Sequence, residues 1–335
     1  MLNRLLGVLR SPVLRVGFLA LALVLAVGYV WRDRSAIADA WSRLDAGSVV
    51  LAGVLSLANV ALSGASWRAV LGDLGSRLPW RAAARVFFVG QLGRYIPGTV
   101  FQFVAQAELA RDHGVPRRRT GSALAVALLV SMTTASLLVA GVLPIALQGR
   151  DIRGWEWTGW LRWLTPLLLV LLVPRVINPL LTFLLRIARQ DPLEHPVTWR
   201  GLLSAAAWAM ASWVAVGLQV FVLSQAVGVA WPTGSALALA IGGYALAWIV
   251  GFLVVLAPAG AGARELVLGA VVALVTGSGA ATVVVLGSRV LLTLADLLLA
   301  FGALAGHRFS AAGRPRTPDD APTDHPTGQP PSATS

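Results

Sequence analysis

The first residues of this sequence that could do chemistry are Arg94 and the proline–glycine break Pro97-Gly98, which interrupt a long apolar stretch. Because proline suits the first turn of a helix, the break predicts a new helix from about Thr99 to His113. The free N–H groups at the start of that helix, together with the Arg94 guanidinium, would favour an anion. The alternative is an ordinary loop between two short helices, with Arg94 reaching toward polar surroundings.

A second break, at Pro258, Gly260 and Gly262, stands between two strongly apolar flanks and is followed at once by Arg264 and Glu265. Glycine and proline let the backbone leave the helical conformation, and small residues let another surface approach closely. Both charged side chains fall in the first turn of the next helix, where N–H groups favour negative charge. A polar loop with a capped helix needs no such charge pair, so a binding site is preferred here.

Two more charges lie inside the last apolar stretch. Arg289 is about nine residues from its start at Ala280, or ~14 Å along a helix. Asp296 lies seven residues further on, on nearly the same helical face. A bilayer core is about 30 Å thick, so Arg289 would lie near its middle, and neither side chain should face lipid. We therefore take both as candidate site residues; an Arg–Asp contact that only holds a helix bundle together is the alternative.

Other kinds of site lack the residues they need. The chain has no cysteine, and its four histidines have no metal-ligand spacing and lie outside the apolar runs. No phosphate-binding loop and no serine–histidine pair at membrane depth is visible. We therefore predict no metal, no cofactor and no catalytic residue, although a role as an enzyme stays open.

The elements that must position these residues are apolar helices. Hydrophobic residues make up 57% of the chain and charged residues 13%, about half the charged fraction of a soluble protein. The fold class predicted is an all-α polytopic membrane protein, a domain of residues 1–306 with a disordered, cytoplasmic polar tail at 307–335. Its apolar runs fall at about 16–31, 47–66, 82–110, 120–147, 161–185, 200–226, 235–276 and 280–305.

Two of these runs, 82–110 and 235–276, contain the breaks and predict re-entrant hairpins beside about six full transmembrane helices. All 27 basic residues are arginine. With cytoplasmic termini and both runs re-entrant, 17 arginines lie on the cytoplasmic side and six outside, as the positive-inside rule expects. The hairpins then open to opposite sides, as inverted-topology repeats require. Arginines placed between membrane helices in this way do not indicate nucleic-acid binding.

The broken segments resemble the lysylphosphatidylglycerol synthase transmembrane-region family, also called flippase-like, over residues 10–306. The segments that carry the resemblance are Arg94-Tyr95-Ile96-Pro97-Gly98, Glu108-Leu-Ala-Arg111-Asp-His-Gly114-Val-Pro116 and Pro258-Ala-Gly-Ala-Gly262-Ala-Arg264-Glu265. The resemblance implies a bundle of about eight spans in the bacterial inner membrane. In bifunctional relatives this region is taken to flip aminoacylated phosphatidylglycerol. Those relatives carry a soluble aminoacyl-transferase domain after it, where this sequence has the tail, so synthesis of that lipid is not expected here.

The leading functional hypothesis is a protein that binds an anionic or zwitterionic lipid headgroup and moves it between leaflets. The alternatives are a catalytic or accessory membrane subunit in lipid or glycolipid synthesis, with a lipid-synthesising enzyme as partner, and a structural membrane scaffold. The residues predicted to bind the headgroup are Arg94, Pro97, Gly98, Pro258, Gly260, Gly262, Arg264, Glu265, Arg289 and Asp296.

Overall fold

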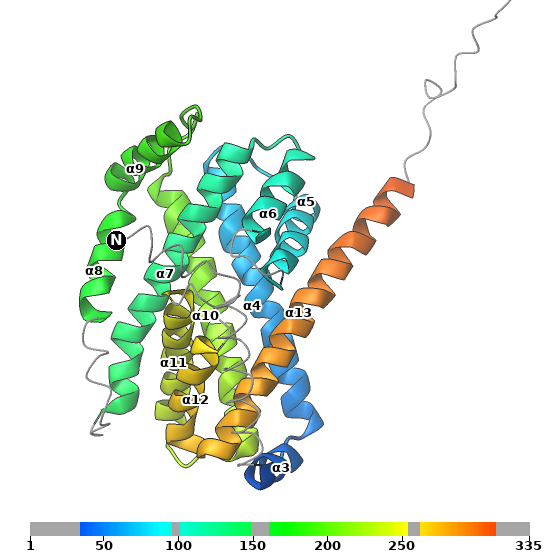
Figure 1. Cartoon of the computed structure of the whole chain (residues 1–335), viewed down its shortest axis with the longest axis vertical. Coiled ribbons are helices and arrows are strands. Elements are labelled where there is room, and N and C mark those ends of the chain that lie inside the picture. Colours follow the sequence, from blue (N-terminus) through cyan, green and yellow to red (C-terminus); the bar gives the residue numbers. More distant parts are fainter. Residues whose placement is uncertain (1–33, 96–100, 149–160, 254–261, 313–335) are drawn as a thin grey trace, which may run out of the picture.

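The computed structural model describes residues 34–95, 101–148, 161–253 and 262–312, and this part of the chain is helical with no strand (Figure 1). The α-helices are α3 (Arg34–Ser42), α4 (Ala46–Asp73), α5 (Trp80–Ala84), α6 (Phe101–Arg111), α7 (Arg117–Leu147), α8 (Leu161–Leu171), α9 (Pro174–Ile187), α10 (Trp199–Val227), α11 (Thr233–Leu253), α12 (Ala263–Thr276) and α13 (Ser278–Ala312). Between α5 and α6 lie a π-helical turn, η1 (Arg85–Val89), and a 3₁₀ turn, η2 (Leu92–Tyr95).

Five helices are long and apolar enough to cross a membrane, namely α4, α7, α10, α11 and α13. The apolar run at 161–185 instead forms α8 and α9, which meet at an angle of 72° where Pro174 begins α9. Counting this bent pair as one span gives six. The prediction of an all-α polytopic membrane protein is therefore confirmed. The first apolar run, 16–31, lies outside the described residues, and α13 continues to Ala312.

Each of the two broken runs folds back on itself. In the first hairpin, α5, η1 and η2 lead inward and α6 returns; in the second, α11 leads inward and α12 returns. A helix of 11 residues, such as α6, or of 14, such as α12, spans only about 16 or 21 Å, which is short of a bilayer core. Neither returning arm is long enough to cross a membrane alone.

The hairpins open at opposite ends of the bundle (Figure 1). At one end, Asp73 at the end of α4 accepts hydrogen bonds of 2.7 Å from the backbone N–H and the hydroxyl of Thr198, just before α10. The first hairpin starts and finishes there, between α4 and α7. At the other end, the Ala230 N–H, before α11, donates to the carbonyl of Val275 in the last turn of α12, at 2.9 Å. The described helices thus have the opposed arrangement that the arginine distribution predicts.

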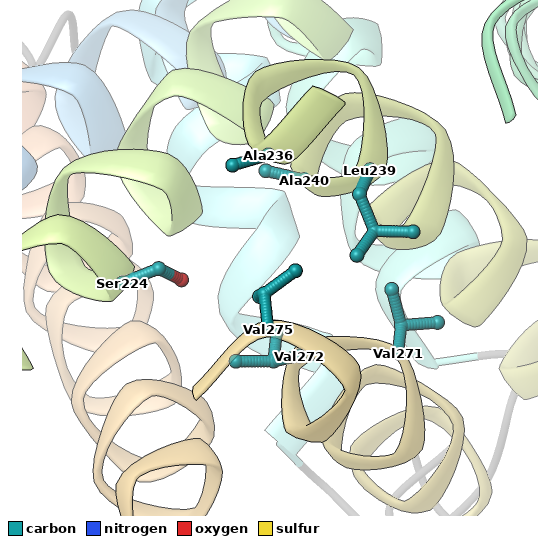
Figure 2. A pocket seen from close by; sticks show the side chains of 7 residues that line it. All are labelled: Ser224, Ala236, Leu239, Ala240, Val271, Val272 and Val275. Atoms are coloured by element: carbon teal, nitrogen blue, oxygen red, sulfur yellow. The ribbon is translucent and has the colours of Figure 1, made fainter. Parts of the chain in front are cut away.

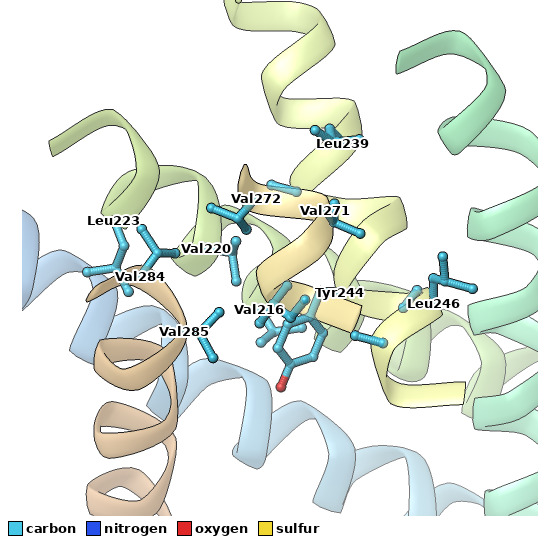
Figure 3. Close-up of a cluster of buried hydrophobic side chains, with 14 of the residues drawn as sticks. Val216, Val220, Leu223, Leu239, Tyr244, Leu246, Val271, Val272, Val284 and Val285 are labelled. Atoms are coloured by element: carbon cyan, nitrogen blue, oxygen red, sulfur yellow. The ribbon is translucent and has the colours of Figure 1, made fainter. Parts of the chain in front are cut away.

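Two buried clusters of apolar side chains hold the hairpins. One joins α4, η1, α7, α9 and α10 around the first hairpin, and the other joins α7, α10, α13 and the second hairpin. Figure 3 shows the second cluster, in which Val271 and Val272 of α12 pack near Val220 of α10 while the Tyr244 hydroxyl points away from the aliphatic side chains. Each hairpin therefore packs in its own apolar core.

Glycine makes close packing within each hairpin possible. A Cβ atom on Gly93 would lie 2.7 Å from the backbone N and Cα of Gln102 on the returning arm. A Cβ on Gly243, in the second hairpin, would lie 2.3 Å from the side chain of Val271. Real Cβ atoms do not approach other atoms so closely, so any larger residue would push the arms apart.

An ionic network closes the end of the bundle where the first hairpin opens. Arg118, in the first turn of α7, pairs with Asp191 at 2.8 Å and also with Glu194, both in the connection between α9 and α10. Arg119 pairs with Glu194 at 2.7 Å and donates to the Ser76 hydroxyl at 2.7 Å. Arg118 and Arg119 thus tie the start of α7 to the α4–α5 and α9–α10 connections.

Replacing Glu194 by glutamine should remove a pH-dependent part of the stability. Hydrogen bonds from Arg119, its own backbone N–H and Arg118 lower the pKa of Glu194 from 4.5 to about 2. A carboxylate whose pKa falls on folding stabilises the fold above its unfolded pKa and loses that effect as pH falls toward the folded value. Wild type should therefore be more thermostable than Glu194→Gln at pH 6, and the difference should vanish by about pH 2. Thermal unfolding in detergent, followed by tryptophan fluorescence, measures it; a difference independent of pH contradicts the assignment.

Candidate functional site

The tip of the first hairpin is joined to the middle of α13. The Arg94 guanidinium lies 3.4 Å from Oδ2 of Asp296, and the Tyr95 hydroxyl donates a hydrogen bond of 2.7 Å to the same oxygen. Asp296 is only 2% exposed, whereas the Arg94 side chain is 30% exposed. A buried carboxylate needs such partners, because burying an unpaired charge costs several kcal/mol.

The start of α12, in the second hairpin, is also joined to α13, at Arg289, seven residues before Asp296. Arg289 lies 3.3 Å from Oε1 of Glu265. The other Glu265 oxygen accepts a hydrogen bond of 2.7 Å from the backbone N–H of Gly262, which precedes α12. Gly262 has a φ of +93°, a conformation that glycine adopts without strain. Glu265 therefore caps its own helix and holds Arg289 at once.

Arg264 is oriented by an aromatic ring rather than by a carboxylate. Its guanidinium lies 4.7 Å from the centre of the Tyr244 ring and donates a hydrogen bond to the Tyr244 hydroxyl. The absence of a Cβ at Gly251 leaves room for this side chain, because a Cβ there would lie 2.8 Å from the Cβ of Arg264. Within the described part of the chain, Arg264 forms no ion pair.

Together, the residues of these three sets of contacts are called the tip cluster: Arg94, Tyr95, Tyr244, Arg264, Glu265, Arg289 and Asp296. Arg264 interacts electrostatically with all four of the other charged members. Arg289 and Asp296, seven residues apart on α13, do not pair with each other: each holds a different hairpin. Three guanidinium groups against two carboxylates leave one positive charge in excess. Residues 96–100 and 254–261, which lie outside the described part of the chain, carry no ionisable side chain.

Asp296 keeps one acceptor without a donor. Its Oδ1 is buried and has no hydrogen-bond partner among the described residues, while Oδ2 receives both Arg94 and Tyr95. Buried polar atoms are nearly always hydrogen-bonded in proteins, so an unpartnered one needs an explanation.

Six of the ten predicted site residues can be placed. The five charged residues come together in the tip cluster, and Gly262 stands beside it as the residue before α12. Pro97, Gly98, Pro258 and Gly260 lie outside the described residues.

Tyr95 and Tyr244 were not among the site residues predicted from the sequence. The whole chain has only three tyrosines, and two of them belong to the tip cluster. Their rarity could have marked both tyrosines as candidate site residues. Tyr95 also directly follows Arg94, and Tyr244 directly follows two glycines.

Outside the tip cluster, the described residues form an exposed ion pair and a small apolar pocket. Glu108 pairs with Arg117 at 2.7 Å on the exposed end of the first hairpin, away from the tips. A small apolar pocket lies between α10, α11 and α12, lined by residues such as Ser224, Leu239 and Val272 (Figure 2). It has no charged lining residue and is formed near the open end of the second hairpin. Among the described residues, no group of three or more histidines or carboxylates could hold a metal ion.

Comparison with known proteins places the chain in a family. No curated protein and no solved structure matches it. The family model described as the lysylphosphatidylglycerol synthase TM region matches residues 13–300, which include both hairpins and the whole tip cluster. The chain therefore belongs to the lysylphosphatidylglycerol synthase TM-region family and is a multi-pass membrane protein of lipid metabolism or transport.

Proposed function

We propose that this protein binds the phosphate-bearing headgroup of a membrane lipid between the two hairpin tips and moves the lipid from one leaflet to the other. The observation that supports it most is that two hairpins from opposite ends each form an ion pair with α13, in a cluster with three arginines. Short helices that end inside a bundle, around charged residues, are typical of sites in transporters.

The chemistry of the tip cluster suits a phosphate. Arginine presents several N–H donors in a planar fork that matches phosphate oxygens, and it stays charged. Arg264 has its charge unmatched by a carboxylate, so it would be the principal phosphate ligand, with Arg94 and Arg289 beside it. Glu265 and Asp296 would orient these arginines or meet a cationic part of the headgroup. From the sequence, the proposal also includes Gly262 and four residues outside the described part of the chain, namely Pro97, Gly98, Pro258 and Gly260.

We further propose a bacterial inner membrane, with both termini and the open end of the first hairpin in the cytoplasm. Among the described residues, that end carries most of the arginines, including Arg77, Arg111 and Arg117, whereas the opposite end carries Arg34 and Arg43. Cytoplasmic loops of membrane proteins are enriched in basic residues. Cysteine accessibility at positions 77 and 43 in intact cells would test this orientation.

Removing two arginines from the tip cluster should abolish transport. In liposomes with fluorescent phospholipids, Arg264→Ala/Arg289→Ala should lower the rate of lipid movement between leaflets by at least about tenfold, because each charge-assisted hydrogen bond is worth roughly 1.5–3 kcal/mol. The matched control is Arg111→Ala/Arg117→Ala, which removes two exposed arginines that pair with Glu108 and should transport normally. Equal rates for wild type, the cluster variant and protein-free liposomes would contradict the proposal.

A second candidate function is supported by the family's description, which names a synthase. In that case the tip cluster would hold a lipid for a lipid-synthesising enzyme, or take part in synthesis, without moving it. Specific lipid retention by the purified protein, without transport in liposomes and together with copurification of a lipid-synthesising enzyme, would favour this function over the first.

A further inference from the structure

The charges and the unpartnered oxygen of the tip cluster narrow the class of lipid. Resting on the proposed headgroup site, we propose that the cluster selects a monoanionic phosphodiester headgroup that carries a hydroxyl group. The hydroxyl would donate a hydrogen bond to Asp296 while the phosphodiester lies against Arg264.

The net charge of the tip cluster favours a ligand with a single negative charge. The cluster holds one positive charge in excess, Arg264 has no ion-pair partner in the described part of the chain, and neither 96–100 nor 254–261 adds an ionisable group. One phosphodiester carries one negative charge and would make the cluster neutral. A phosphomonoester dianion would leave it negative, and a zwitterionic headgroup would leave it positive. Uncompensated charge is costly away from water, so the single phosphodiester fits best.

Asp296 adds a requirement for a hydrogen-bond donor on the ligand. Oδ1 of Asp296 is buried and unpartnered among the described residues, while Arg94 and Tyr95 both lie against Oδ2. A donor on the ligand would satisfy it, and either an ammonium or a hydroxyl could supply that donor. An ammonium would cancel the phosphate charge within the headgroup and leave the excess charge of Arg264 unmatched. A hydroxyl satisfies both conditions together.

The net charge of the cluster also disfavours a headgroup esterified with lysine. Such a headgroup carries two ammonium groups and one phosphate, so its own net charge is positive and it would raise the excess charge of the cluster to two. If the cluster selects a ligand that neutralises its charge, this protein should bind lysylphosphatidylglycerol, the lipid after which its family is named, poorly.

Four headgroups that vary charge and donor independently test the proposal. The protein is reconstituted in equimolar phosphatidylglycerol (monoanionic, hydroxyl donor), phosphatidylmethanol (monoanionic, no donor), phosphatidylethanolamine (zwitterionic, donor) and phosphatidylcholine (zwitterionic, no donor). It is then extracted in mild detergent, and the retained lipids are quantified by mass spectrometry. We expect phosphatidylglycerol to be enriched about tenfold over each lipid that lacks one of the two properties, since a hydrogen bond to a charged group is worth about one factor of ten or more.

Variants of the protein test separately its preference for a monoanionic headgroup and its preference for a hydroxyl donor. Arg264→Gln should abolish the preference for monoanionic over zwitterionic lipids, and Arg264→Lys should restore it. Asp296→Asn should abolish the preference for phosphatidylglycerol over phosphatidylmethanol. Arg117→Gln, on the exposed end of the first hairpin, should behave like wild type.

The wild-type ranking alone decides the matter even if a variant does not fold. Retention in proportion to the lipid mixture, or preference for phosphatidylethanolamine, overturns the proposal even where transport occurs. The expected ranking without transport in liposomes supports the selectivity and overturns lipid translocation, so the two proposals fail separately.

Discussion

Replacing Asp296 by asparagine is expected to destabilise the protein by about 2–4 kcal/mol, one of the largest effects among single substitutions. Asp296 is 2% exposed and holds both Arg94 and Tyr95 at the tip of the first hairpin. Removing one partner of a buried ion pair leaves the other charge without compensation, which typically costs 3–5 kcal/mol. The value expected here is lower because Arg94 is partly exposed. Chemical or thermal unfolding in mixed micelles gives the change in free energy.

A double-mutant cycle isolates the pair. If Arg94 and Asp296 interact as described, Asp296→Asn should cost about 1–2 kcal/mol less in an Arg94→Gln background than in wild type. The matched control is Asp39→Asn, which breaks the exposed pair of Asp39 with Arg43 at 2.6 Å and should cost less than about 1 kcal/mol. An Asp296→Asn variant that is no less stable than Asp39→Asn would show that the tip of the first hairpin is not held by this contact.

Much of the fold was predictable because its signals are local. Runs of about 20 apolar residues mark membrane helices, and proline with glycine between such runs marks the two hairpins. The arginine distribution predicted that the hairpins enter from opposite ends, because charge is sorted across a membrane during insertion. These signals do not depend on which helices are neighbours.

The bend between α8 and α9 was not predictable from proline alone. Pro144 lies inside α7, Pro166 inside α8 and Pro179 inside α9, and these helices continue through them. Of the three prolines in α8 and α9, only Pro174 stands at the change of direction, since it occupies the start of α9. Whether proline ends a membrane helix depends on what satisfies the freed backbone groups and on tertiary packing, which the sequence does not display.

The sequence also did not predict which residues of the tip cluster contact each other. Arg289 and Asp296 share a helix and nearly a face, so a contact between them was one interpretation; in the structure each reaches a residue of a different hairpin. Which hairpin residue pairs with Arg289 or Asp296 depends on the position along α13 at which each hairpin contacts that helix. Tyr244 was missed for the same reason, because its contact with Arg264 requires the α11–α12 hairpin to close.

A methyl group added at Gly93 should open the first hairpin and remove Arg94 from the tip cluster. The new Cβ would lie 2.7 Å from the Gln102 backbone and 2.9 Å from the carbonyl carbon of Phe101. Backbone atoms cannot move aside as a flexible side chain can, so Gly93→Ala should cost about 2–3 kcal/mol, the upper range for overpacking. It should also lower lipid transport, because Arg94 is the next residue along the chain. Unfolding in mixed micelles and the liposome assay measure the two effects.

Gly121→Ala provides the control for this substitution. Gly121 lies inside α7, and a Cβ added there meets no atom within 4 Å. Alanine favours a helix over glycine by up to about 1 kcal/mol, so this variant should be as stable as wild type or slightly more so. The contrast matters because both changes add the same methyl group: if Gly93→Ala and Gly121→Ala have equal stability and equal transport, close packing at the hairpin tip does not position Arg94. If only Gly93→Ala loses both, the separation of the hairpin arms controls the site.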